Sequence, residues 1–264
     1  MSTLVCFHAH PDDEAIGTGG LMAKAAAAGH RVVLITATNG EQGEPKPGVL
    51  ADGEPLAERR LVELERSAKI LGAELLLMGY EDSGMMGEPA NDNPACFWQA
   101  DLDDAAGRLA DLLREIEPDV LTIYDEHGLY GHPDHIKVHQ VGLRAAELVG
   151  LDHVYLGTVN RDRALAGFSA MREHLGPDAD LPDPDDFAEF GMPENDLSYE
   201  IDATAFAEVK KEALSQHRSQ VSPDDFFLAM PDEAFVTMFG WETYAIPGVT
   251  GTGGPEVVEL LPGL

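Results

Sequence analysis

Two short segments of the 264-residue chain carry the side chains best suited to chemistry. The first, His10-Pro11-Asp12-Asp13-Glu14, follows an apolar run at Leu4–Ala9, and the second is Tyr130-Gly131-His132-Pro133-Asp134-His135. A catalytic zinc usually has three protein ligands from His, Asp or Glu and keeps a fourth position for water. The two segments offer such ligands at His10, Asp12, Asp13, Glu14, His132, Asp134 and His135. We therefore expect them to meet around one metal ion.

The local sequence favours this meeting. Pro11 and Pro133 hold the residue before them extended, so each preceding histidine is presented at a bend. His132 and His135 are three residues apart and would share one face at the start of a helix. Both segments follow predicted strands, and in an open α/β sheet ligands bind at the carboxyl ends of the strands.

The rest of the chain alternates between strand and helix patterns. Continuous apolar runs predict strands at Leu4–Ala9, Arg31–Thr38, Glu74–Met78, Asp119–Tyr124 and His153–Val159. Helical spacing predicts helices at Ala15–Gly29, Leu56–Leu71, Leu102–Ile116 and Pro133–Val149. This alternation predicts an α/β protein with a Rossmann-like three-layer fold and a mostly parallel sheet.

We expect a single domain over residues 1–264, with the Rossmann-like core at about 1–160. Residues of about 161–246 are predicted to form substrate-lid and C-terminal elements, an α/β or loop-rich extension over the active site. They include a helix at Ala203–His217 and an acidic loop or lid at 176–195. Residues of about 247–264 are rich in Gly and Pro and are predicted to form a flexible tail.

The composition limits the partners. There are 48 acidic residues against 17 Lys and Arg, a formal net charge of −31. Such a surface repels nucleic acid and anionic lipid, so we expect a neutral or cationic small-molecule substrate. No apolar run approaches the roughly 20 residues of a membrane span, and no leader precedes Leu4, so a cytoplasmic protein is expected. The sequence leaves open whether the chain forms a homo-oligomer.

The two segments resemble the paired motifs of the zinc-dependent PIG-L/LmbE-like de-N-acetylases, a family that includes N-acetylglucosaminyl-phosphatidylinositol deacetylases. Other stretches are similar to the actinobacterial, mycothiol-pathway-like branch. They are Gly79–Met85, Phe190–Pro193 and His217–Gln220, while Thr38–Gly43 and Arg60 with Glu63 resemble the loop and helix that follow the second strand in the family as a whole. The resemblance extends over most of residues 4–230.

The resemblance implies a role for each site residue. His10, Asp13 and His135 would bind one Zn²⁺ per chain, although Fe²⁺ or another divalent ion suits the same ligands. Asp12 would be the general base, His132 and Tyr130 would stabilise the oxyanion, and Asp134 would orient His132. Arg60 and Asp82 would contact substrate.

The implied function is hydrolysis of the N-acetyl amide of an N-acetylglucosamine-type molecule, with a glucosaminyl-inositol as one candidate. A metal-dependent amidase acting on a larger amide, such as a mycothiol S-conjugate, is the alternative. A non-catalytic Rossmann-like binding module is a further alternative. Two neighbouring features receive structural interpretations: Glu14 as an acid at a helix start, and Gly17-Thr18-Gly19-Gly20 as a close helix–strand contact rather than a nucleotide loop.

Overall fold

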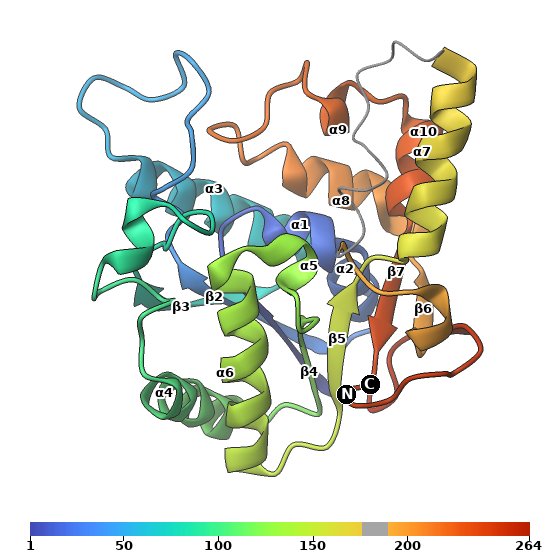
Figure 1. The fold of residues 1–264 in the computed structure, drawn as a ribbon, viewed down its shortest axis with the longest axis horizontal. Helices are drawn as coiled ribbons and strands as arrows, with labels where there is room; N and C mark the ends of the chain where they lie inside the picture. The colour runs from blue at the N-terminus through green and yellow to red at the C-terminus, as the bar shows by residue number, and fades with distance from the viewer. Residues whose placement is uncertain (176–189) are drawn as a thin grey trace.

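The computed structural model describes residues 1–175 and 190–264, so most of the predicted acidic loop at 176–195 lies outside the described residues. One sheet of eight strands organises the fold (Figure 1). The strands are β1 (Thr3–His8), β2 (Arg31–Thr38), β3 (Glu74–Tyr80), β4 (Val120–Tyr124), β5 (Val154–Thr158), β6 (Tyr199–Asp202), β7 (Trp241–Ala245) and β8 (Glu256–Val258).

Helices connect and cover these strands. They are α1 (Asp13–Gly17), α2 (Gly19–Ala27), α3 (Leu56–Leu71), α4 (Leu102–Ile116), α5 (Gly128–Gly131), α6 (Pro133–Val149), α7 (Arg161–Leu175), α8 (Ala207–Leu214), α9 (Phe226–Ala229) and α10 (Asp232–Phe239). Short 3₁₀ turns lie at Pro89–Asp92, Glu194–Asp196 and Thr204–Phe206. None of the helices in the described residues is long and apolar enough to cross a membrane.

The sheet runs in the order β3-β2-β1-β4-β5-β7-β6-β8. The first five strands are parallel, as the buried apolar runs predicted, and β7 is antiparallel to both β5 and β6. The chain builds outward from β1 to β3 and then crosses to β4 on the other side of β1. The carboxyl ends of β1 and β4 therefore flank the topological switch point, where open α/β sheets bind their ligands.

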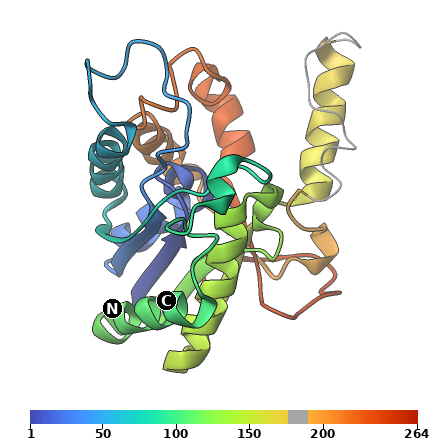
Figure 2. The same ribbon diagram turned by 60° about the vertical axis from the view of Figure 1, so that its left-hand side comes forward.

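Helices cover both faces of the sheet, which gives the predicted three layers (Figure 2). On one face, α4 and α6 pack against alternate strand residues such as Val5, Phe7 and Ile35. On the other face, α2, α3 and α8 pack against the intervening residues, such as Leu4, Cys6 and Leu34. Each helix buries a stripe at helical spacing, for example Leu64, Ala68 and Leu71 of α3, which is why the periodicity located them.

The predicted Rossmann-like fold is confirmed, with differences in detail. The helix expected over Ala15–Gly29 is two helices, separated at Thr18, whose φ of −136° is not helical. The prediction of a flexible tail at about 247–264 is wrong for its last residues. There, β8 pairs in parallel with β6, and Leu261 is fully buried. Strands β6 and β7 lie in the region that the sequence predicted only as an α/β or loop-rich extension.

A buried ion pair explains the Gly-Thr-Gly-Gly segment. The Glu242 carboxylate accepts hydrogen bonds from the backbone N–H groups of Gly20 and Leu21 at the start of α2, and from Lys210 at 2.7 Å. A Cβ at Gly20 would come within 2.9 Å of this carboxylate. The helix start is thus filled by the protein's own acid, in agreement with the structural interpretation of this segment.

Replacing Glu242 with Gln is expected to destabilise the protein by about 3–5 kcal/mol, because Lys210 would be left buried without its counter-charge. Both side chains of the pair are only 3% exposed. The free energy of unfolding in urea measures the effect. Asp103→Asn, which breaks an exposed pair with Arg144, is the control and should cost less than about 1 kcal/mol; equal losses for the two variants would contradict the prediction.

The net charge of −31 predicts a salt-dependent stability. Raising NaCl from about 0.1 M to about 1 M shortens the screening length from roughly 10 Å to roughly 3 Å, which weakens repulsion among surface acids. A gain of only about 1–2 kcal/mol would raise Tm by roughly 2–8 °C for a chain of this size. Calorimetry in NaCl, with equimolar sucrose as a control that cannot screen charge, tests this; a Tm that is constant in NaCl would refute it.

Candidate metal centre

Two elements at the switch point position the residues of the centre. His10 leaves the end of β1, and Asp13 begins α1 directly after it. His135 lies in the first turn of α6, which starts at Pro133, and His132 caps that helix: its Nδ1 accepts the backbone N–H of Asp134 at 3.1 Å. The prolines thus place the histidines at bends, as the sequence predicted.

Three atoms that could bind a metal form a nearly equilateral triangle. Asp13 Oδ2 lies 3.4 Å from His10 Nδ1 and 3.4 Å from His135 Nε2, and the two nitrogens are 3.3 Å apart. Tetrahedral zinc with bonds of about 2.0–2.1 Å requires ligand atoms roughly 3.3–3.4 Å apart. The triangle therefore has the size of one face of a tetrahedral site, and the fourth corner is left for water or substrate.

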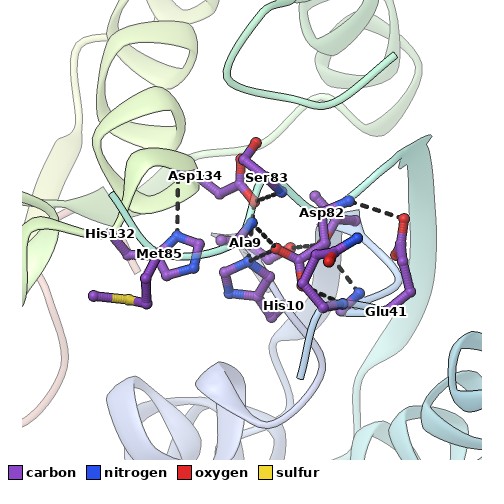
Figure 3. Close-up of polar contacts among 12 residues, drawn as sticks. Ala9, His10, Glu41, Asp82, Ser83, Met85, His132 and Asp134 are labelled. Atoms are coloured by element: carbon purple, nitrogen blue, oxygen red, sulfur yellow. Dashed lines mark hydrogen bonds and ion pairs between the residues drawn. The ribbon is translucent and has the colours of Figure 1, made fainter. Parts of the chain in front are cut away.

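The far side of the His10 ring supports this assignment. His10 Nε2 lies 3.1 Å from Asp134 Oδ2 and 3.4 Å from Asp82 Oδ1 (Figure 3). Asp134 is itself held by Ser83, whose backbone N–H and hydroxyl both donate to its carboxylate. A metal-bound histidine commonly donates its other N–H to a carboxylate in this way, which leaves the facing nitrogen free as a ligand.

The charge balance of the centre also calls for a cation. Burial lowers the pKa of His10, but hydrogen bonds to Asp13, Asp134 and Asp82 outweigh burial and hold this pKa well above its usual value. The surrounding carboxylates thus favour positive charge at this point. A divalent ion would supply that charge, so the residues present fit a metal.

Two other groups of potential ligands lie close together, but they fit less well. One combines His10 with His132 and His135, and the other combines His10 with Asp82, His132 and Asp134. The second group would use His10 Nε2, the nitrogen that faces Asp134 and is best placed to donate to it. The first would use His132, whose Nδ1 already accepts the Asp134 N–H. Of the three groups, the triangle of His10, Asp13 and His135 therefore fits a metal best.

Asp12 lies beside this triangle in a strained conformation. Its φ of 101° is in the left-handed region, which costs a residue other than Gly about 1–3 kcal/mol. Its side chain is 21% exposed and its Oδ2 accepts from Arg60 at 3.2 Å. Burial raises the pKa of Asp12, and the opposing effect of Arg60 does not cancel this. The result is a carboxylate that water can reach, with a pKa shifted toward that of a general base.

His132 and Tyr130 lie against the histidines of the triangle: the His132 ring contacts that of His10, and the Tyr130 ring contacts that of His135. Burial, with the neighbouring His10 and His135, lowers the pKa of His132 to about 3, so this imidazole is neutral near pH 7. Because Nδ1 accepts a hydrogen bond, the proton of the neutral ring is on Nε2, which can donate. The Tyr130 hydroxyl is 3.5 Å from His135 Nε2, and the tyrosine is half-exposed.

Several predicted site residues make contacts other than those expected. The Asp134 carboxylate contacts His10 and Ser83, and only the Asp134 backbone N–H reaches His132. Arg60 is buried, and its guanidinium donates to the carbonyls of Pro11 and Gly40 as well as to Asp12. Asp82 is buried and accepts the backbone N–H groups of Gln42 and Gly84. Direct contact of Arg60 and Asp82 with substrate stays a prediction.

Two residues of the surroundings, Ser83 and Tyr124, were not singled out from the sequence, and a third, Glu14, has a partner that was not expected. Ser83 holds Asp134, and Tyr124 stacks on His135 with ring centroids 4.4 Å apart. Glu14 lies in the first turn of α1, as expected, but it is also fully buried and pairs with His217. Tyr124 is the last residue of a predicted strand, which was the available signal, whereas Ser83 lies in the loop after β3. Nothing local marked the distant partner of Glu14.

The fold and the centre together define a Rossmann-like α/β protein with a His/Asp cluster suited to one metal at the sheet switch point. Residues 5–146 match the model of the PIG-L family, described as GlcNAc-PI de-N-acetylase. The chain belongs to this family, as its paired motifs indicated.

Relatives and solved structures agree with this membership. The chain is 38% identical to a protein of Thermomonospora curvata, with 96% of this chain and 92% of the relative aligned. It is 40% identical to one of Acidothermus cellulolyticus, with 97% and 91% aligned. Both relatives are named 1D-myo-inositol 2-acetamido-2-deoxy-alpha-D-glucopyranoside deacetylase. The fold matches N,N'-diacetylchitobiose deacetylase from Pyrococcus horikoshii with a TM-score of 0.61 and 22% identity, covering 94% of this chain and 84% of that one.

Proposed function

We propose that the protein is a zinc-dependent hydrolase that removes the acetyl group from an N-acetylglucosamine-type small molecule, with a glucosaminyl-inositol as the substrate. The observation that carries this proposal is the triangle of His10, Asp13 and His135, with Asp12 as the residue directly before Asp13. The two relatives named above act on an acetamido sugar joined to inositol, which supports this substrate. A neutral sugar also suits a chain with a net charge of −31.

The proposed chemistry needs a nucleophile, a proton acceptor and a stabiliser of negative charge. Zinc held by His10, Asp13 and His135 would lower the pKa of a water to about 7 and polarise the amide carbonyl. Asp12 accepts the proton of the attacking water as the new C–O bond forms. The C–N bond then breaks as Asp12 passes this proton to the nitrogen, so that the free amine and acetate are the products and Asp12 is a carboxylate again.

His132 and Tyr130 are proposed to act on the oxygen of the amide. The His132 Nε2–H is available as a donor because Nδ1 is occupied by the Asp134 N–H. Donors aimed at an oxyanion in a site shielded from water stabilise the transition state by about 2.7–4 kcal/mol each. The Tyr130 hydroxyl, close to His135, is the second proposed donor. Asp134 supports both the His10 ring and the cap of α6.

Zinc is proposed because two nitrogens and one carboxylate oxygen with an open position are typical of its catalytic sites. Fe²⁺ accepts the same ligands, so the choice of ion requires direct measurement. One metal per chain, a cytoplasmic location and a homo-oligomer stay predictions.

The test is release of free amine from a panel of N-acetylated sugars that includes N-acetylglucosaminyl-inositol, together with larger amides. Protein loaded with zinc is compared with protein treated with a chelator and with chelated protein given zinc again. We expect amine release from the acetylated sugars, its loss after chelation and its recovery with zinc. Release from larger amides alone would favour the amidase, and binding of the sugar without amine release from any compound would favour the non-catalytic module.

A further inference from the structure

The buried acid behind Asp12 has no role in the chemistry proposed above. The Asp12 N–H donates to Glu14 Oε2 at 2.9 Å, and the carbonyl of the same Pro11–Asp12 peptide accepts from Arg60. The peptide that leads into Asp12 is therefore held on both sides. Asp12 is one of three residues other than Gly with positive φ among the described residues, so its backbone needs such support.

Glu14 is in turn fixed from two distant parts of the chain. Its other oxygen, Oε1, accepts from the Ser67 hydroxyl at 2.5 Å and lies 2.7 Å from His217 Nε2. Ser67 belongs to α3, and His217 follows α8. All three side chains are fully buried, so none of them contacts solvent or could reach a substrate.

We propose that Glu14 is a positioning residue: held by Ser67 and His217, it keeps the Asp12 backbone in its left-handed conformation and so aims the Asp12 carboxylate at the metal centre. The inference rests on the proposed function, because it gives Glu14 a role only through Asp12. An acid that stabilised only the packing of α1 on α8 would not need to contact the Asp12 N–H. The position of Oε2 on that N–H separates the two explanations.

The same interface contains a matched control. Glu63, also on α3 and also buried, accepts the backbone N–H and the hydroxyl of Ser219 at 3.0 Å and 2.6 Å. This pair anchors the loop that carries His217, but none of its hydrogen bonds reaches Asp12. Removing Glu63 thus disturbs the packing of the loop, while Glu14 keeps its hydrogen bonds with Ser67 and with the Asp12 N–H.

The experiment compares Glu14→Ala, Glu14→Gln and Glu63→Gln for kcat, KM, bound zinc and Tm, with the acetylated sugar cleaved fastest in the panel above as substrate. Since displacement of a catalytic group by about 1 Å can cost roughly 10²-fold, we expect Glu14→Ala to lower kcat by about 10- to 100-fold. KM and zinc content should stay unchanged. Glu14→Gln should lower kcat less than Glu14→Ala does. The amide oxygen of Gln can still accept a hydrogen bond from one of the three groups that contact Glu14, which are the Asp12 N–H, the Ser67 hydroxyl and His217 Nε2. Glu63→Gln should lower Tm without lowering kcat.

The decisive comparison is made in an Asp12→Asn background. There, Glu14→Gln should have no further effect on kcat, because coupled residues are not additive. If Glu14→Gln lowered kcat by the same factor in the wild-type protein and in the Asp12→Asn protein, the inference would be overturned. A wild-type kcat in both Glu14→Ala and Glu14→Gln would also overturn it. If Glu14→Ala does not fold, the Glu14→Gln pair alone decides the question. Failure of the proposed function would appear instead as no release of free amine by the wild-type protein from any compound of the panel, so the two failures are distinguishable.

Discussion

Replacement of Asp12 with Asn is expected to leave zinc bound and to lower kcat by about 10²–10⁴-fold, the usual contribution of general-base catalysis. Asn keeps the size and the hydrogen-bonding reach of the side chain but cannot accept the proton of the attacking water. Asp12 is not one of the three atoms of the triangle, so the metal should be retained. Steady-state kinetics and elemental analysis of the same preparation measure both quantities.

The chain contains a matched control for this variant. Pro223-Asp224-Asp225 repeats the tripeptide Pro11-Asp12-Asp13, and Asp224 is exposed. Asp224→Asn should therefore have the kcat and the zinc content of the wild type. A near-normal kcat in Asp12→Asn would refute the role of Asp12, whereas loss of zinc in that variant would show that Asp12 is a ligand.

Removal of a proposed ligand is expected to have the other large effect. His10→Ala or His135→Ala would leave two of the three donor atoms, and we expect the affinity for zinc to fall by more than about 100-fold, beyond the 10- to 100-fold typical of supporting residues. Activity should be lost with the metal. Zinc content after dialysis, followed by titration with a chelating dye, gives the affinity.

Asp134→Asn provides the graded comparison. Its carboxylate supports His10 without being part of the triangle, so zinc should bind about 10- to 100-fold more weakly but should still bind. His153→Ala, at an exposed histidine just before β5, should bind zinc as the wild type does. Unchanged affinity in His10→Ala would contradict the assigned ligand set.

The sequence predicted the part of the molecule in which local signals agree with the fold. Parallel strands buried on both faces are apolar throughout, so β1, β2 and β4 were visible as runs. Strand ends then indicated where His10 and His135 would meet. Strands β6 and β7 gave no such signal, because buried acids interrupt them: Glu200 pairs with Arg163, and Glu242 pairs with Lys210.

The contacts of individual site residues depend on tertiary structure and were less visible. Asp12 and Asp13 are adjacent carboxylates of the same type, and only the turn at Asp12, with its positive φ, separates their directions. The family resemblance implied that Asp134 orients His132, yet its carboxylate reaches His10, 124 residues away. Likewise, β8 has only three residues, too few to give a strand pattern, and it is ordered by pairing with the edge of β6.

The triangle has a consequence for folding as well as for catalysis. Its two nitrogens belong to residues 125 positions apart, on opposite sides of the chain crossover. A metal bound there acts as a cross-link that closes a long loop, and such a link favours the native state because the unfolded chain rarely brings both ends together. The concentration of available metal would then affect the fraction of the protein that is folded, as well as the rate of the proposed reaction.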